Sequence, residues 1–129
     1  MAIIIDRIDH AVLTVRNIDA TCDFYHEVLG MEVISFGEGR RALKFGSQKF
    51  NLHEAGNEFE PKAHRPTRGS ADFCLITTTP MAKVTARLAV CGVDVFEGPV
   101  ARTGASGPIT SVYFRDPDLN LVEVSVYDC

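Results

Sequence analysis

The stretch Asp116-Pro117-Asp118-Leu119-Asn120-Leu121-Val122-Glu123 places a tight turn directly before the last apolar strand of the chain. Asp, Pro and Asn favour turns, and the apolar residues that follow them are typical of a strand. That strand carries one acidic side chain, Glu123. An ionised carboxylate among valines and leucines is costly unless it binds a cation or a proton donor. The sequence therefore predicts a partner for Glu123.

Length and composition indicate one ordinary globular domain that spans residues 1–129. The 129 residues are 46% hydrophobic and 23% charged, which is enough to bury a core. The net charge of −4 and the scattered basic residues argue against a nucleic-acid partner. No apolar run approaches the ~20 residues that cross a bilayer, and the N-terminus lacks a signal-peptide pattern. We therefore expect a cytoplasmic protein with no membrane partner, and the four widely spaced cysteines are typical of reduced thiols.

Hydrophobic periodicity predicts the same order of elements twice along the chain. A shift of 62 positions superposes Leu13 on Leu75 and Gly30 on Gly92, and both glycines end predicted helices. The chain is therefore predicted to be an internal duplication, with module 1 at about 6–57, a connector at 58–70 and module 2 at about 71–127. The predicted strands include 8–15, 32–36, 41–45, 49–54 and 71–77, and the predicted helices run from Asn17 or Asp19 to Leu29 and from Pro80 to Cys91.

The duplication brings four metal-capable residues into corresponding positions. The shift of 62 places His10 over Asp72, near the start of the first strand of each module. A related shift of 70, which allows eight extra residues around 97–108, places His53 over Glu123 in the last strand of each module. If the two modules curl into a shared trough, all four side chains can converge on one point.

Two imidazoles and two carboxylates suit Zn, Fe(II), Mn, Ni or Co. Such an ion can act as a Lewis acid toward a carbonyl or phenolate, or it can activate bound water. The alternative for a histidine on a strand is a hydrogen-bonded structural role. Glu54 is the rival of His53 if the strand register slips by one residue. The symmetric positions of the four residues favour the metal site.

Three further residues are candidates for contact with a substrate. Arg102 lies in a predicted long loop before the seventh strand, which either closes over a substrate or forms a surface connection. Tyr113 and Phe45 are aromatic residues on strands, so they line either the trough or the core.

Several segments resemble the signature of the vicinal oxygen chelate superfamily: Asp9-His10, Asp23-Phe24-Tyr25 through Leu29-Gly30-Met31, and Phe114-Arg115-Asp116-Pro117-Asp118 with Asn120 and Glu123. Within that superfamily the chain is most similar to small lactoylglutathione lyase-like glyoxalase-domain proteins, through Lys49-Phe50-Asn51-Leu52-His53-Glu54 and the segment from Glu97-Gly98-Pro99 to Gly107-Pro108. The resemblance implies an α+β fold in which two βαβββ modules form an open eight-stranded, barrel-like trough. It also implies a divalent metal (Zn, Ni, Co, Mn or Fe(II)) and a homodimer.

The resemblance places the four ligand positions of the family at His10, His53, Asp72 and Glu123. Glyoxalase I normally carries Glu at the position of His53, so the order of the ligands is altered here. Thr14 stands where bacterial glyoxalase I has an arginine that helps to hold glutathione. In the mechanism that the family suggests, Glu123 is the base of an enediolate isomerisation and Asp72 takes the mirrored role.

The resemblance therefore implies a divalent-metal-dependent lyase or isomerase of the glyoxalase type that acts on a small carbonyl or thiol-adduct substrate. One alternative is an extradiol-type Fe(II) dioxygenase with His10, His53 and Glu123 as its ligands. Another alternative is a non-catalytic protein that binds a small molecule, such as an antibiotic, in the same trough.

Overall fold

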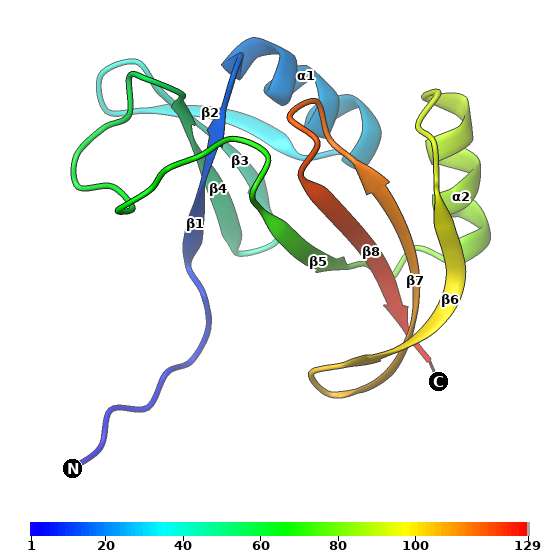
Figure 1. Cartoon of the computed structure of the whole chain (residues 1–129). Coiled ribbons are helices and arrows are strands. Elements are labelled where there is room, and N and C mark those ends of the chain that lie inside the picture. Colours follow the sequence, from blue (N-terminus) through cyan, green and yellow to red (C-terminus); the bar gives the residue numbers. More distant parts are fainter. Residues whose placement is uncertain (129) are drawn as a thin grey trace. The chain divides into compact units, whose positions relative to one another are not determined.

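The computed structural model describes residues 1–128 and divides the chain into two compact units, Met1–Thr67 and Arg68–Cys129. Both units contain a strand, a helix and three further strands (Figure 1). Unit 1 consists of β1 (His10–Val15), α1 (Ile18–Leu29), β2 (Glu32–Phe36), β3 (Arg40–Phe45) and β4 (Gln48–Glu54). Unit 2 consists of β5 (Asp72–Ile76), α2 (Met81–Val90), β6 (Glu97–Gly104), β7 (Gly107–Arg115) and β8 (Leu121–Tyr127). This order confirms the α+β fold of two βαβββ modules.

The two sheets have the same topology. Their strand orders are β1-β4-β3-β2 in unit 1 and β5-β8-β7-β6 in unit 2. In each sheet the first strand of the unit pairs in parallel with the last strand, and the remaining neighbours are antiparallel. His10 and Asp72 each begin the first strand of their unit. The two units therefore repeat one topology, as the predicted duplication requires.

The sheet of unit 1 has an apolar face and a polar face, because side chains alternate along each strand. Helix α1 covers the apolar face, where the Tyr25 ring lies 6.4 Å from the Phe50 ring. The buried strand residues on this face are Leu13, Val15, Leu43, Phe50 and Leu52. The opposite face, called the polar face of unit 1 below, carries His10, Arg40, Lys49, Asn51 and His53.

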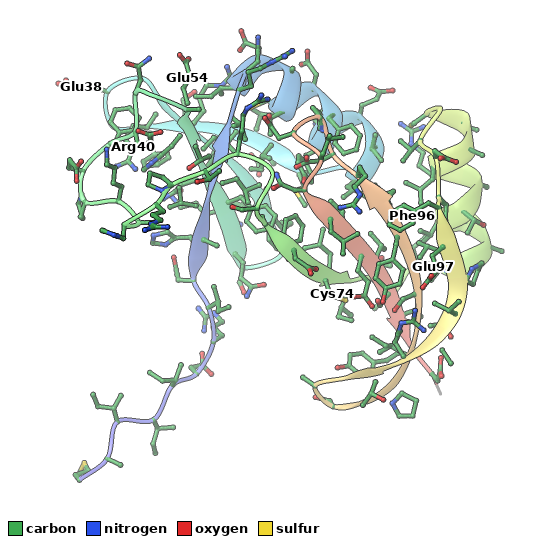
Figure 2. All side chains as sticks on the ribbon, in the orientation of Figure 1. Glu38, Arg40, Glu54, Cys74, Phe96 and Glu97 are labelled. Carbon is green, nitrogen blue, oxygen red and sulfur yellow. The ribbon has the colours of Figure 1, made fainter. Side chains whose placement is uncertain are left out.

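The sheet of unit 2 divides in the same way. Its apolar face buries Val112, Phe114, Val122 and Val124, and α2 contributes the buried residues Val84 and Leu88. The opposite face, called the polar face of unit 2 below, carries Asp72, Cys74, Glu97, Arg102, Tyr113, Glu123 and Ser125. Figure 2 labels Cys74 and Glu97, which lie on the two edge strands of this sheet.

Helix α1 has a start and an end that follow from its sequence. The Asn17 side-chain Oδ1 accepts a hydrogen bond of 2.9 Å from the Ala20 backbone N–H, so Asn17 rather than Asp19 is the N-cap. Gly30 adopts the left-handed conformation at φ 67, which glycine favours and which ends the helix. Neither helix of residues 1–128 has the length and hydropathy needed to span a membrane.

Strand β6 corrects the prediction of a long loop around Arg102. The segment pairs with β7 as an antiparallel edge strand, with a register irregularity between Glu97 and Val100. Gly98 has a φ of +106, and a side-chain carbon there would meet the Ser111 carbonyl oxygen at 2.4 Å. The glycine and proline content that indicated a loop therefore reflects an irregular strand that passes close to its neighbour.

The turn between β7 and β8 is organised by the buried carboxylate of Asp116. This carboxylate accepts hydrogen bonds from the backbone N–H groups of Asp118 (2.9 Å) and Asn120 (3.0 Å) and from the Asn120 side-chain amide (2.9 Å). The Asn120 Oδ1 in turn accepts a hydrogen bond of 2.9 Å from the Ala71 backbone N–H. The turn thereby fixes the starts of β5 and β8, the strands that carry Asp72 and Glu123.

Candidate metal and substrate site

Glu123 lies in a row of polar side chains that crosses the sheet of unit 2. The strand register aligns Cys74 on β5, Glu123 on β8, Tyr113 on β7 and Glu97 on β6. Residues aligned in this way point to the same face of a sheet. The half-buried carboxylate of Glu123 therefore has a thiol on one side and a phenol on the other.

Hydrogen bonds from the next row support Glu123. The Ser125 hydroxyl donates to Glu123 Oε2 at 3.3 Å. Ser125 is fully buried, and its Oγ also lies 2.6 Å from Ser111 Oγ and 3.1 Å from Cys74 Sγ. Burial raises the pKa of the Cys74 thiol. This thiol is therefore protonated at neutral pH and is not a nucleophile.

Arg102 and Tyr113 form a hydrogen-bonded pair on the other side of Glu123. The Arg102 Nε donates a hydrogen bond of 3.0 Å to the Tyr113 hydroxyl, and Arg102 Nη2 forms an ion pair with Glu97. Desolvation raises the pKa of the Tyr113 phenol; the hydrogen bond from Arg102 opposes this shift, and the neighbouring Glu123 carboxylate adds to it. The phenol therefore stays protonated and can donate a proton at neutral pH. The structure thus places Arg102 and Tyr113 on the same face as Glu123.

Asp72 lies on the polar face of unit 2, one row away from Glu123. It pairs with Leu121, two residues before Glu123 on the neighbouring strand. Diagonal neighbours on adjacent strands are within reach of long side chains. Asp72 is exposed, and Glu123 is half-buried. The polar face of unit 2 therefore offers two carboxylates to a cation.

His10 lies at the start of β1 on the polar face of unit 1. Its Nδ1 forms a hydrogen bond of 2.9 Å with Asp9 Oδ1, and both side chains are exposed. A carboxylate on one ring nitrogen fixes the orientation of the imidazole and leaves the other nitrogen for a ligand. This arrangement is typical of histidines that bind metals.

His53 has quite different surroundings. Its ring is only 2% exposed and lies edge-on to the Phe59 ring. The Arg40 guanidinium Nη2 lies 3.4 Å from His53 Nε2. A guanidinium can only donate, so Nε2 accepts and the ring is neutral. Burial and the charge of Arg40 both lower the pKa of His53.

The strand register corrects the predicted correspondence between His53 and Glu123. Asn51 pairs with Val12, and Glu123 pairs with Cys74, which is the residue equivalent to Val12 under the shift of 62. Asn51 therefore occupies the position of Glu123 in unit 1, and His53 corresponds to Ser125. The true shift between the last strands is 72 rather than 70. Strand alternation already placed Asn51 on the face of His53, but only the register identifies its row.

Phe45 does not lie on the polar face of unit 1. It pairs with Gln48 and lies on the apolar face together with Phe50, whose ring is 4.9 Å away. This placement contradicts the prediction that Phe45 lines the trough. Leu43 is two residues before Phe45, so the two side chains share one face of the strand, and Leu43 is fully buried. This spacing is the signal that would have identified Phe45 as a core residue.

The structure places two of the predicted ligands on the polar face of each unit. Within residues 1–128, no three His, Cys, Asp or Glu side chains gather in the geometry of a metal site. Asp72 and Glu123 share the polar face of unit 2, and His10 and His53 share that of unit 1 in rows four residues apart. The convergence of all four residues stays a prediction.

We expect His53 to make the stability of the protein depend on pH. Its folded-state pKa lies below the unfolded value of about 6.5, so between these two values only the unfolded chain binds the proton. The free energy of unfolding therefore falls as the pH decreases from about 6.5 to the folded-state pKa. His53→Gln keeps an acceptor for Arg40 and cannot titrate, so urea unfolding should depend less on pH between about 7 and 5.

His64→Gln is the matched control, because His64 is an exposed histidine in the segment after β4. This variant should keep the pH dependence of the wild type. Equal pH dependence in the two variants would show that the environment of His53 does not govern this effect.

Comparison with known proteins places the chain in a family. Residues 7–124 match the model of the Glyoxalase/Bleomycin resistance protein/Dioxygenase superfamily. The chain is 57% identical to Virulence protein STM3117 of Salmonella typhimurium over 96% of this chain and 86% of that protein. It is 54% identical to the Glyoxalase domain-containing protein RDO1 of Mycosarcoma maydis over 93% of this chain and 68% of that protein.

Solved structures agree with this assignment. The crystal structure of STM3117 superposes with a TM-score of 0.96 at 56% identity, covering 98% of this chain and 100% of that one. An integron cassette protein of Vibrio cholerae, VCH_CASS1, superposes with a TM-score of 0.97 at 55% identity, covering 99% and 100%. The chain belongs to the Glyoxalase/Bleomycin resistance protein/Dioxygenase superfamily.

Proposed function

We propose that the protein is a divalent-metal-dependent lyase or isomerase of the glyoxalase type, which acts on a small carbonyl compound or a thiol adduct. The observation that carries this proposal is the pair of carboxylates, Asp72 and Glu123, on one face of the sheet of unit 2. Glu123 lies between a proton-donating phenol and a network of hydroxyl groups. A carboxylate in such surroundings is suited to move a proton.

The donor chemistry fits a divalent cation. Asp72 and Glu123 are the proposed oxygen ligands, and His10 is the proposed nitrogen ligand. Carboxylates and imidazole together suit Zn, Ni, Co, Mn or Fe(II). His10 fits this role because Asp9 holds its Nδ1 and leaves Nε2 for coordination. His53 does not fit, because a cation on its Nε2 would meet the positive charge of Arg40.

The side chains of unit 2 have distinct parts in the proposed reaction. The bound ion would supply Lewis-acid stabilisation of the substrate oxygens. Glu123 takes a proton from the carbon next to the carbonyl and returns it to the neighbouring carbon. The Ser125 hydroxyl, 3.3 Å away, holds the carboxylate in position. Tyr113 and Arg102 are the proposed contacts for a substrate oxygen, and Asp72 is the mirrored acid or base.

The dioxygenase alternative has less support. That chemistry requires two histidines and a carboxylate on the iron. The second histidine would be His53, whose Nε2 faces Arg40 and whose ring is buried. The binding alternative requires no carboxylate pair, so it leaves Asp72 and Glu123 without a role.

A survey of metals and substrates tests the proposal. The protein would be loaded in turn with Zn, Ni, Co, Mn and Fe(II) and assayed with methylglyoxal plus glutathione, methylglyoxal plus other thiols, and catechols. We expect metal-dependent turnover of a carbonyl or hemithioacetal substrate that Glu123→Gln abolishes. Turnover of catechols alone would replace the proposal with the dioxygenase alternative.

A further inference from the structure

We propose that the polar face of unit 1 binds a compact oxyanion, a carboxylate or phosphate group, through the cationic side chains of Arg40 and Lys49. The site uses neither Asp72 nor Glu123, and it does not depend on the proposed function. Its evidence is the fixed position of Arg40, the two cations that form no ion pair, and buried polar atoms that lack partners.

Aromatic rings hold the Arg40 guanidinium in place. Its central carbon lies 4.9 Å from the centre of the Phe36 ring and 4.7 Å from that of the Phe59 ring. Figure 2 shows Arg40 on the side of the sheet where the segment after β4 loops back. Aromatic rings occupy the faces of a guanidinium and leave its edges for hydrogen bonds. One edge contacts the neutral ring of His53, which accepts a hydrogen bond but carries no charge.

Neither cation at this place is paired with a carboxylate, although Asp9 acts electrostatically on Lys49 and Glu58 acts on His53. Among residues 1–128, neither Arg40 nor Lys49 forms an ion pair with Asp or Glu. The Lys49 ammonium lies 3.8 Å from the centre of the same Phe36 ring that Arg40 contacts. Two cationic groups therefore share one aromatic ring. Cations brought together without a carboxylate partner are suited to an anionic ligand.

Three buried polar atoms on the polar face of unit 1 have no hydrogen-bond partner: Arg40 Nε, His53 Nδ1 and Asn51 Oδ1. Buried polar groups in native proteins almost always have partners. Because His53 Nε2 accepts from Arg40, the ring proton is on Nδ1, so Nδ1 and Arg40 Nε are both donors. Two unused donors beside a cation favour the oxygens of a carboxylate or phosphate.

Calorimetric titration tests the proposal with the full chain and no added metal, so that the anion has no metal ion to bind. Inorganic phosphate is the first probe and acetate is the second, at constant ionic strength. We expect saturable phosphate binding that Arg40→Gln and Lys49→Gln each weaken by about tenfold or more, the effect of losing a charged hydrogen bond. Competition by acetate would assign the site to carboxylates as well as phosphates.

Lys83→Gln is the matched control, because Lys83 is an exposed cation on α2 of unit 2 and does not belong to the polar face of unit 1. This variant should bind phosphate like the wild type. Arg40→Lys keeps the charge and should retain part of the affinity, and circular dichroism would verify that each variant is folded. The absence of saturable binding in the wild type, or an equal loss in Lys83→Gln, would overturn the proposal. Glu123→Gln should bind phosphate normally, which separates this test from that of the metal site.

Discussion

Asp116→Ala is expected to lower the free energy of unfolding by about 3 kcal/mol. The substitution leaves the backbone N–H groups of Asp118 and Asn120 and the Asn120 amide without their acceptor. These groups are buried in a turn that has little room to rearrange, because Leu119 already adopts a positive φ of 68. Urea unfolding measures the effect.

Two control variants sharpen this prediction. Asp94→Ala removes an exposed acidic residue of the same unit and should change the free energy of unfolding by less than about 0.5 kcal/mol. Asp116→Asn keeps one acceptor oxygen but directs an amide toward the Asn120 amide, so its cost should lie between those of the other two variants. If Asp116→Ala unfolds at the same urea concentration as Asp94→Ala, the turn does not stabilise the unit in this way.

Glu123→Gln is expected to weaken the binding of a divalent cation by more than about 100-fold, since the loss of a supporting group around a metal already costs 10–100-fold. The amide keeps the shape of the side chain but removes the charge that attracts the cation. Calorimetric titration with Ni, Co, Mn and Zn measures the affinity.

Glu97→Gln is the matched control for Glu123→Gln. Glu97 lies in the same row of the same face, but its carboxylate is engaged by Arg102. This variant should bind the cation nearly as well as the wild type. If both substitutions weaken cation binding equally, the affinity depends on the overall charge of the face and not on Glu123 in particular.

The sequence was sufficient to predict the topology, because the apolar repeat, the two helix-ending glycines and the turn at Asp116 each depend on local chemistry. The face of His53 was also predictable, since shifts of 70 and 72 have the same parity and place its side chain on the same side of the strand. Its row was not predictable, because the extra residues of unit 2 are spread over β6, β7 and the turn before β8, and only the strand pairing shows how they are divided.

The contacts around His53 were beyond prediction for a different reason. Arg40 and His53 are 13 residues apart and meet only because β3 and β4 pair in one register. Phe59 joins them from a segment without regular secondary structure. Phe45 was misplaced because an aromatic residue on a strand suits either face; its two-residue spacing from Leu43 and its ring contact with Phe50 place it on the apolar face.

The most direct test of the proposed metal-dependent function is the metal content of the purified protein. The wild type and Glu123→Gln would be purified without chelator, incubated with Zn, Ni, Co, Mn or Fe(II), dialysed and analysed for bound metal. We expect stoichiometric metal in the wild type and its loss in Glu123→Gln. A wild type that holds no stoichiometric amount of any of these metals would contradict the proposed metal-dependent function.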